Sequence, residues 1–560
     1  MRDQNLWATG YAHPKPWDQR YPAMTVPEML AGAVARVPHA PMIDFMGRTY
    51  GYAEVLDGAR RVAAGLHAMG VVRGDRIGLF LPNVPHYVAA YYGALMLGAV
   101  VVNFSPLYSV EELAHQVEDS GTRVLFTLSA TALLPTAVKV LAASGLERLV
   151  VGSIAGVLPP AKSLLYRLLK RKEVAARPDD ARITTFSALI ANDGRFPEPA
   201  MDAARDVALI QYTGGTTGSP KGAMLTHQNL TANARQIIDV DPEAGAPDRI
   251  VGALPLFHIF ANACVLNRTV ANGGTMVLLP RFDAAAVLAA VERTKATSLP
   301  GVPTMYQALM DHPKLATTDL SSLRVCISGG APLAGPVKAR FEAATGAVLV
   351  EGYGLTESGI AATNPYEGLA KTGTIGQPLP ATTIRLVDRE DATRDAPPGE
   401  PGEIVIHGPQ VMVGYWNRPD LGPEQDGATF AGGGLRTGDV GVIDEDGYVR
   451  IVDRLKDMIS VGGFKVFPSR VETVLYRHDA VRDAIVIGVP DAYQGERPKA
   501  FVTLMEGAGV TGDELMAWLN PLVGKHERCV AVEVRDVLPR TLVGKLSRKE
   551  LVAEELAKAG

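Results

Sequence analysis

One short loop constrains this chain more than any other segment. Residues 212–222 read YTGGTTGSPKG and follow a strand-like apolar run at residues 207–211. A loop of Gly, Thr and Ser lets backbone N–H groups and hydroxyls converge on phosphate oxygens, and a lysine adds a point charge. It is not the GxxxxGK[ST] pattern, because Gly222 follows the lysine. We expect a phosphate-binding loop rather than a plain surface turn, formed by Thr213, Gly214, Gly215, Thr216, Thr217, Gly218 and Lys221.

The pattern around this loop predicts an α/β fold. Apolar runs at residues 75–81, 123–127 and 149–151 read as buried strands, and helical patterns lie between them. Strands that alternate with helices are typical of a parallel sheet covered by helices. Thr25 and Glu28 have the capping-box spacing and predict a helix start.

The C-terminal part has a different pattern of predicted strands and helices. From about residue 375 to 452, short strands with Gly and Pro turns indicate a β-rich subdomain, and residues 440–443 and 448–452 flank a DEDG turn as in a hairpin. Residues 453–560 read as a small α+β domain, with capping boxes at Ser469 and Thr511. We therefore expect a large N-terminal domain over residues 1–452, with α/β subdomains and the β-rich subdomain, and a small α+β domain over 453–560.

Composition narrows the class of protein. The net charge of −5 provides no basic excess of the kind that nucleic-acid binders carry. The three cysteines are far apart, which argues against a disulfide framework or a CxxC metal site. Residues 1–21 lack the apolar stretch of a signal peptide, and the apolar run at residues 87–102 is shorter than a membrane span. We read that run as a buried helix followed by a strand, and we expect a cytoplasmic protein.

Six further segments complete a recognisable order along the chain: residues 254–258 (LPLFH), 328–333 (SGGAPL), 351–357 (EGYGLTE), 436–439 (RTGD), 453–457 (DRLKD) and 538–545 (LPRTLVGK). With the loop, they resemble the signature motifs of the adenylate-forming superfamily, which includes acyl-CoA synthetases, firefly luciferase and peptide-synthetase adenylation domains. Within it, residues 103–108, 451–459 and 464–468 resemble bacterial long-chain fatty acid–CoA ligases.

The resemblance implies a two-step reaction. A carboxylic acid, expected to be a medium- or long-chain fatty acid, is joined to the α-phosphate of ATP with Mg²⁺, and the acyl group then passes to coenzyme A. Residues 1–452 would form the AMP-binding domain. Residues 453–560 would form a mobile lid that swings about a hinge at Asp453 between the two steps.

The same resemblance assigns the site residues. Lys545, Glu357, Thr213 and His258 would be catalytic, and Thr213 and Glu357 would hold Mg²⁺. Lys545 would bridge the ATP phosphate and the substrate carboxylate, whereas His258 would border the carboxylate pocket without acting as a base. The nucleotide would contact the loop residues named above together with Gly330, Ala331, Pro332, Glu351, Gly352, Tyr353, Gly354, Thr356, Asp439 and Arg454, and the thiol channel would involve Gly462, Gly463 and Lys465.

Two segments depart from the pattern of relatives. Residues 432–436 read GGGLR where many relatives carry an aromatic residue, and residues 525–529 read KHERC without a proline that is usual there. The second departure concerns the thiol side rather than adenylate formation.

Several alternatives stay open from the sequence. An aryl or other carboxylic acid fits the same chemistry, and a carrier protein fits as the acyl acceptor in place of coenzyme A. A non-catalytic acyl-nucleotide sensor is disfavoured, because the segments that carry Glu357 and Lys545 read intact. Residues 162–172 form a basic amphipathic stretch that fits either a surface helix or a peripheral membrane contact. A homodimer is also left open.

Overall fold

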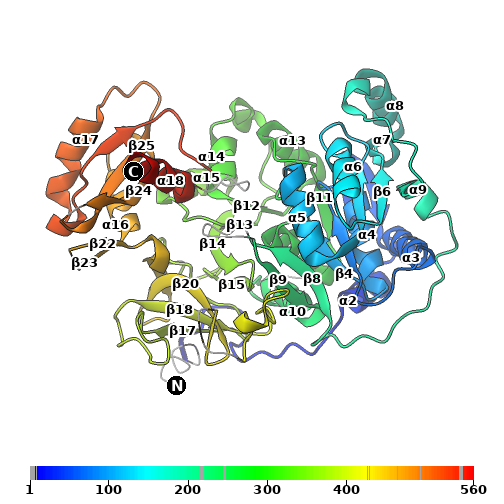
Figure 1. Cartoon of the computed structure of the whole chain (residues 1–560), viewed down its shortest axis with the longest axis horizontal. Helices are drawn as coiled ribbons and strands as arrows, with labels where there is room; N and C mark the ends of the chain where they lie inside the picture. The colour runs from blue at the N-terminus through cyan, green and yellow to red at the C-terminus, as the bar shows by residue number, and fades with distance from the viewer. Residues whose placement is uncertain are drawn as a thin grey trace. The chain divides into compact units, whose positions relative to one another are not determined.

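The computed structural model of the chain (Figure 1) describes residues 7, 9–213, 220–243, 248–424, 427, 429–462, 464–491, 493–540 and 546–559. Internal contacts divide these residues into two compact units. Unit 1 comprises residues 7–213, 220–383 and 406–435, and unit 2 comprises residues 384–405 and 436–559. A domain boundary at residue 453 lies inside unit 2 and stays a prediction.

Unit 1 contains a seven-stranded sheet in the order β7-β6-β5-β3-β4-β8-β9. The pairs are parallel except β8 with β9, which form an antiparallel hairpin. The strands are β3 (Arg76–Leu79), β4 (Val100–Asn103), β5 (Thr122–Leu128), β6 (Arg148–Gly152), β7 (Ile183–Thr185), β8 (Val207–Tyr212) and β9 (Gly222–Thr226). The predicted strands at residues 75–81, 123–127 and 149–151 are thus confirmed as β3, β5 and β6, within a residue or two at their ends.

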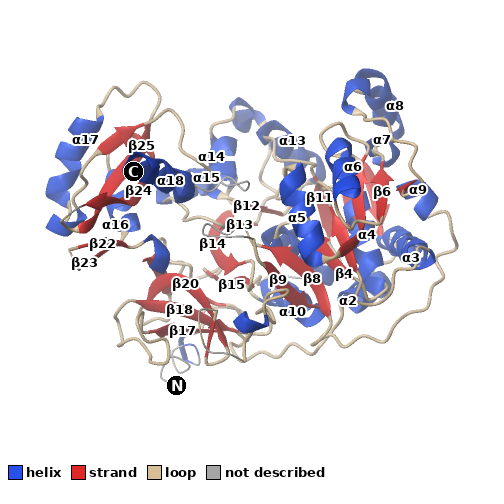
Figure 2. Cartoon of the chain, in the orientation of Figure 1, coloured by secondary structure: helices blue, strands red, loops and turns tan. Residues whose placement is uncertain are grey.

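Helices accompany these strands along the chain (Figure 2). They are α2 (Val26–Arg36), α3 (Tyr52–Ala68), α4 (Pro85–Met96), α5 (Val110–Ser120), α6 (Leu134–Ala143), α7 (Ile154–Val157), α8 (Pro160–Leu169), η1 (Arg171–Glu173), α9 (Phe186–Leu189) and α10 (His227–Asp239). Thr25 caps α2 with the predicted capping box. The apolar run at residues 87–102 is confirmed as the buried helix α4 followed by the buried strand β4.

A second sheet in unit 1 has nine strands in the order β16-β15-β14-β13-β12-β10-β11-β1-β2. Its central pairs are parallel, and both edges are antiparallel. The strands are β1 (Pro41–Phe45), β2 (Arg48–Gly51), β10 (Arg249–Gly252), β11 (Thr275–Leu278), β12 (Ser298–Gly301), β13 (Val325–Gly329), β14 (Val348–Leu355), β15 (Gly359–Thr363) and β16 (Gln377–Pro378). The helical segments between them are α11 (Ile259–Ala261), the π-helix η2 (Asn262–Asn267), α12 (Arg268–Asn272), α13 (Ala284–Thr294), α14 (Pro303–Met310), η3 (Pro313–Thr317) and α15 (Gly335–Thr345).

The predicted β-rich region forms a five-stranded sheet in the order β17-β18-β20-β19, with β21 also paired to β20. Its strands are β17 (Thr383–Val387), β18 (Gly402–His407), β19 (Phe430–Ala431), β20 (Gly434–Ile443) and β21 (Val449–Arg454), and the short helices η4 (Pro419–Leu421) and η5 (Leu455–Asp457) precede β19 and follow β21. The predicted hairpin is confirmed as β20 and β21, joined by residues 444–448.

The last hundred residues form a sheet in the order β23-β22-β25-β24, with β26 beside β25, packed with helices. The strands are β22 (Ile459–Val461), β23 (Phe464–Val466), β24 (Val481–Asp491), β25 (Gly495–Leu504) and β26 (Val532–Val534). The helices are α16 (Pro468–Leu475), α17 (Gly512–Leu519), η6 (Asn520–Leu522), η7 (Lys525–Glu527) and α18 (Arg548–Ala559). The capping box at Thr511 is confirmed.

The capping box predicted at Ser469 is wrong. Helix α16 begins at Pro468, one residue earlier, and Phe467 precedes it without a side-chain cap. A proline at the first helical position has no N–H to satisfy and fixes a helical φ, so it starts the helix before the serine. The Ser469 side chain then bonds to Asp453, as described below.

No helix among the described residues is long and apolar enough to cross a membrane.

Candidate functional site

The expected phosphate loop connects the two strands of the β8–β9 hairpin. Beyond the paired residues Tyr212 and Gly222, the Thr213 N–H donates to the Lys221 carbonyl at 2.9 Å. The Lys221 N–H donates in turn to Thr213 Oγ1 at 3.4 Å. Both ends of the loop are therefore fixed by the edge of the sheet. Five of its expected contact residues lie outside the described residues: Gly214, Gly215, Thr216, Thr217 and Gly218.

One aromatic side chain joins this hairpin to the EGYGLTE segment. The Lys221 ammonium lies 5.0 Å from the centroid of the Tyr415 ring, within cation–π range. The Tyr415 hydroxyl donates to Glu357 Oε1 at 2.7 Å. The backbone holds this arrangement, because Tyr415 bridges to Ala223 of β9 and the Met412 N–H donates to the Glu357 carbonyl. Lys221, Tyr415 and Glu357 thus form a continuous line.

Tyr415 is a component that the sequence did not single out. It is 8% exposed, and its burial, followed by the nearby Glu357 carboxylate, raises the pKa of its hydroxyl. The hydroxyl therefore stays protonated and acts as the donor in this pair. Its run of aromatic residues with Trp416 is visible in the sequence, but nothing local indicates that Glu357 is its partner.

Glu357 and Thr356 lie in the turn between β14 and β15. This turn is narrow, because a Cβ added to Gly354 would lie 1.8 Å from the Gly359 carbonyl oxygen. A glycine is thus required there, since any side chain would collide with backbone. The turn presents Glu357 at the end of a strand rather than at a helix start.

Two of the segments predicted to contact the nucleotide lie side by side at the ends of parallel strands. In the β13–β14 register, Ser328 is opposite Glu351 and Gly329 is opposite Gly352. Ligands of α/β folds commonly bind beyond the carboxyl ends of such strands. Gly330, Ala331 and Pro332 follow β13 directly, with Gly330 at φ +84°, whereas Gly352, Tyr353 and Gly354 belong to β14.

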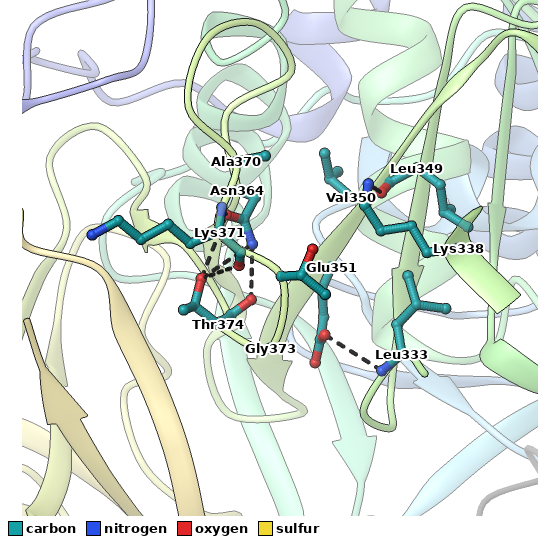
Figure 3. A pocket seen from close by; sticks show the side chains of 11 residues that line it. Leu333, Lys338, Leu349, Val350, Glu351, Asn364, Ala370, Lys371, Gly373 and Thr374 are labelled. Atoms are coloured by element: carbon teal, nitrogen blue, oxygen red, sulfur yellow. Dashed lines mark hydrogen bonds between the residues drawn. The ribbon is translucent and has the colours of Figure 1, made fainter. Parts of the chain in front are cut away.

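A pocket opens beside Glu351 (Figure 3). Glu351 Oε2 accepts from the Leu333 N–H at 3.4 Å, and burial raises the pKa of this carboxyl to about 7 against the opposing effect of that N–H. On its other side, Asn364 donates to the Thr374 carbonyl at 2.8 Å and accepts from the Lys371 N–H at 2.9 Å. The sequence did not indicate this polar cluster. It places a carboxyl with a pKa of about 7 next to residues 330–332, which are predicted to contact the nucleotide.

His258 caps the short helix α11 and is half-buried. Its Nδ1 accepts from the Phe260 N–H at 3.2 Å, so a neutral ring carries its proton on Nε2. The Phe260 ring packs on β13, because a Cβ at Gly329 would lie 2.9 Å from Phe260 Cε1. The LPLFH segment therefore adjoins the strand that leads to Gly330.

In unit 2, Asp439 and Arg454 are directly opposite each other on β20 and β21. Arg454 Nε donates to Asp439 Oδ1 at 2.9 Å, and the Asp439 side chain is almost fully buried. The Asp439 N–H donates to Thr437 Oγ1 at 3.0 Å, just after Gly438 at φ +70°. The two predicted nucleotide contacts of this region are thus one cross-strand ion pair.

Asp453, the expected hinge, is buried and bonded across unit 2. Its Oδ2 accepts from the Ser469 N–H at 3.0 Å and lies 3.0 Å from the Ser469 hydroxyl, which also contacts the Val452 carbonyl, and its Oδ1 accepts from the Arg454 N–H. Burial raises the pKa of Asp453 against these hydrogen bonds. In this state of the molecule the start of α16 is tied to the end of β21.

Of the predicted thiol-side residues, Gly462 follows β22 directly and Lys465 lies in β23, the partner strand of the hairpin. Gly462 is exposed at φ +54°, and its N–H donates to the Gln494 carbonyl at 2.8 Å. Lys465 is exposed opposite Ser460. Gly463 and Lys545 lie outside the described residues. The residues on either side of the 541–545 segment, Arg540 and Leu546, pair as an antiparallel bridge.

The chain matches known families and proteins over nearly its whole length. The family described as AMP-binding enzyme matches residues 30–416, and the AMP-binding enzyme C-terminal domain matches residues 470–545. A long-chain-fatty-acid–CoA ligase of Bacillus subtilis (strain 168) is 39% identical over 99% of each chain. A feruloyl-CoA synthase of Amycolatopsis sp is 38% identical over 92% of this chain and 96% of its own. The crystal structure of ATP-bound MatB from Rhodopseudomonas palustris has a TM-score of 0.83 at 29% identity, over 95% of this chain and 99% of that one.

Proposed function

Because the chain belongs to the AMP-binding enzyme family, we propose that it activates a medium- or long-chain fatty acid with ATP and transfers the acyl group to coenzyme A. The observation that carries the proposal is the line from Lys221 through Tyr415 to Glu357, which couples a cation at the base of the phosphate loop to a carboxylate. The full-length similarity to a long-chain-fatty-acid–CoA ligase supports the choice of acid.

In the first step, a carboxylate oxygen of the fatty acid attacks the α-phosphorus of ATP. The bond from that phosphorus to the bridging oxygen breaks, and pyrophosphate leaves with the electron pair. Because both reactants are anions, catalysis depends mainly on positioning them and on neutralising their charge with positive groups. Lys221 and the loop from Thr213 onward would hold the phosphates, and Lys545 would bridge phosphate and carboxylate.

The acid needs no general base, because a carboxylic acid is ionised near pH 7. His258 is suited to another task. Its Nδ1 accepts from the Phe260 N–H, which orients the ring at the start of α11, next to the strand that leads to Gly330. We therefore assign His258 to orienting the acid.

The nucleotide base and ribose would be held by the segments described above. The adenine would lie between the residues after β13 and those of β14: Gly330, Ala331, Pro332, Glu351, Gly352, Tyr353, Gly354 and Thr356. Asp439 would accept hydrogen bonds from the ribose hydroxyls, and Arg454, bonded to Asp439, would orient that carboxylate.

Glu357 and Thr213 would hold Mg²⁺ together with the phosphates of ATP. The donor set fits, since magnesium takes oxygen ligands and is commonly bound by one or two carboxylates plus substrate phosphates. No group of three or more His, Cys, Asp or Glu side chains suited to a metal is present in the described part of the chain. When bound, the ion neutralises phosphate charge as pyrophosphate departs.

In the second step, the coenzyme A thiol attacks the acyl carbon of the adenylate, loses its proton, and AMP leaves with the oxygen. We propose that residues 453–560 rotate about Asp453 between the steps. Gly462 and Gly463 would leave room for the pantetheine arm, because they lack Cβ atoms, and Lys465 would contact the nucleotide part of coenzyme A.

One specific observation favours a second candidate substrate. The feruloyl-CoA synthase is almost as similar to this chain as the fatty acid ligase is, so an aromatic acid fits the same chemistry. The two candidates are distinguished by the acid that the protein activates.

The test is AMP formation by the purified protein with ATP, Mg²⁺ and a panel of fatty and aromatic acids, with and without coenzyme A. AMP and acyl-CoA formed from fatty acids, and lost in Glu357→Gln, support the proposal. Product from aromatic acids alone selects the second candidate. No AMP with any acid, from protein shown to bind ATP, contradicts both.

A further inference from the structure

Helix α8 presents a row of leucines to solvent. Leu164, Leu165, Leu168 and Leu169 are 62%, 55%, 63% and 71% exposed, and no residue of the helix is buried. A soluble helix normally turns its apolar stripe toward the core. Contiguous exposed apolar residues, unlike single ones, mark an interaction surface.

The opposite face of α8 attaches the helix to unit 1. The Ser163 hydroxyl donates to the Ala155 carbonyl at 2.7 Å, and Tyr166 packs against the main core. At about 100° per residue, the leucines cover an arc of about 140°, and Ser163 and Tyr166 lie on the other side. The leucines thus face away from the protein because the helix is held by its polar side. Figure 1 shows α8 beside α7, the element that follows β6.

Cations border the leucine row. Residues 160–173 contain five basic side chains, Lys162, Arg167, Lys170, Arg171 and Lys172, and one acid, Glu173. On the helical projection, Lys162 and Arg167 lie at the two margins of the leucine arc. Lys162 also donates to the Met46 carbonyl at 2.8 Å, which ties the start of α8 to the turn between β1 and β2.

We propose that α8 and the residues that follow it dock on an anionic lipid surface, with the four leucines in the acyl region and the cations at the headgroup phosphates. A helix with leucines on one arc and Lys and Arg at its margins has the composition of an interfacial helix. Residues 160–173 carry an excess of four positive charges, which is complementary to an anionic leaflet. An acidic groove of a protein would match the charge but would also need to bury the leucines.

This surface is distinct from the site described above and does not rest on the assigned reaction. The helix would bring the whole chain to a bilayer whether or not its acid is a lipid. Binding and catalysis can therefore be tested separately.

The test is co-sedimentation of the full chain with vesicles of phosphatidylcholine, alone or with phosphatidylglycerol at about three to one. We expect binding to the mixed vesicles that weakens with salt. The double variant Leu164→Ser/Leu168→Ser should bind at least about tenfold more weakly, since it removes two of the four inserted side chains. The matched control is Leu522→Ser/Leu556→Ser, two leucines that are each 56% exposed elsewhere, and it should bind as the wild type does.

A second variant tests insertion directly. Leu165→Trp should show a blue shift of its added fluorescence with mixed vesicles and none with phosphatidylcholine alone. The proposal is overturned if the wild type does not bind the mixed vesicles, or if the leucine variant binds them as strongly as the wild type does. It is also overturned if the fluorescence of the added tryptophan does not shift. A wild-type dimer that becomes a monomer in the leucine variant would instead identify this face as a contact between two copies, which also overturns it.

Discussion

Lys221 and Tyr415 form a cation–π pair, with the ammonium 5.0 Å from the ring centroid, and the hydroxyl of the same tyrosine donates to Glu357. One side chain therefore sets the separation between the loop cation and the carboxylate that we assign to magnesium. The ring of Tyr415 contacts Lys221 and its hydroxyl contacts Glu357, so a substitution can remove one contact and keep the other.

Tyr415→Phe removes the hydrogen bond to Glu357 and keeps the ring under Lys221. Because hydrogen bonds to charged groups contribute about 1.5–3 kcal/mol, kcat/KM for ATP should fall about tenfold or more. The measurement is AMP formation as a function of ATP and Mg²⁺. Tyr21→Phe is the control, since Tyr21 donates to Asp239 at 2.8 Å outside the site. Equal effects of the two variants would contradict the assignment.

Lys545→Ala should block adenylate formation and spare acyl transfer. We assign the lysine to bridging the ATP phosphate and the substrate carboxylate. Once the adenylate has formed, these two separate groups no longer exist. The measurement compares AMP formation from acid and ATP with thioester formation from a synthetic acyl-adenylate and coenzyme A. A loss of both steps to the same extent would refute this division.

Glu351→Gln should stabilise unit 1 at neutral and alkaline pH. Because burial raises the pKa of Glu351 to about 7, its contribution to stability is complete below about pH 4.5 and is lost as the pH rises to 7. Glutamine does not titrate and still accepts from the Leu333 N–H. The variant should gain on the order of 3 kcal/mol relative to wild type between pH 4.5 and 8. Thermal unfolding midpoints at both pH values measure it, and a pH-independent difference would count against the buried carboxyl.

Arg454→Ala should raise KM for ATP about tenfold with little change in thermal stability. The arginine side chain is 48% exposed, so its ion pair with Asp439 contributes at most about 1 kcal/mol to folding. Its loss would matter because Asp439, which we assign to the ribose hydroxyls, would lose the partner that orients its carboxylate. Arg450→Ala, an exposed arginine on the same strand, is the control. If both variants change KM alike, the pair has no special role.

Ser469→Ala should affect the two half-reactions unequally. The substitution removes the hydroxyl that contacts the Asp453 carboxylate and the Val452 carbonyl, and it leaves the backbone N–H bonded to Asp453 in place. If Asp453 is the hinge, loosening it changes the balance between the two domain orientations, and the rates of adenylation and acyl transfer should shift by different factors, each of a few fold. Single-turnover measurements of each step decide it, and a uniform change would argue against a hinge here.

Local signals were sufficient for much of the fold. The capping boxes of Thr25 and Thr511, the apolar strands and the β20–β21 hairpin all depend on residues close in sequence, and each is present. The adjacency of the segments around Ser328 and Glu351 follows from the parallel pairing that alternating strands and helices predict.

Contacts between distant segments were not predictable in this way. Ser469 looked like a helix cap, but its side chain bonds to Asp453, and Pro468 starts the helix instead. Tyr415 has no local feature that identifies Glu357 as its partner, because the pairing depends on a bridge to Ala223 of β9. The exposure of the α8 leucines likewise required knowledge of which face the protein covers.

The hydrogen bonds between Thr213 and Lys221 continue the pairing of β8 with β9 up to the start of the loop. This pairing limits where the chain can change in length. A residue added or lost within β9 would reverse the side of the sheet to which each following side chain points, and would move Ala223 away from Tyr415. Natural insertions and deletions should therefore be absent from the strand that follows the loop.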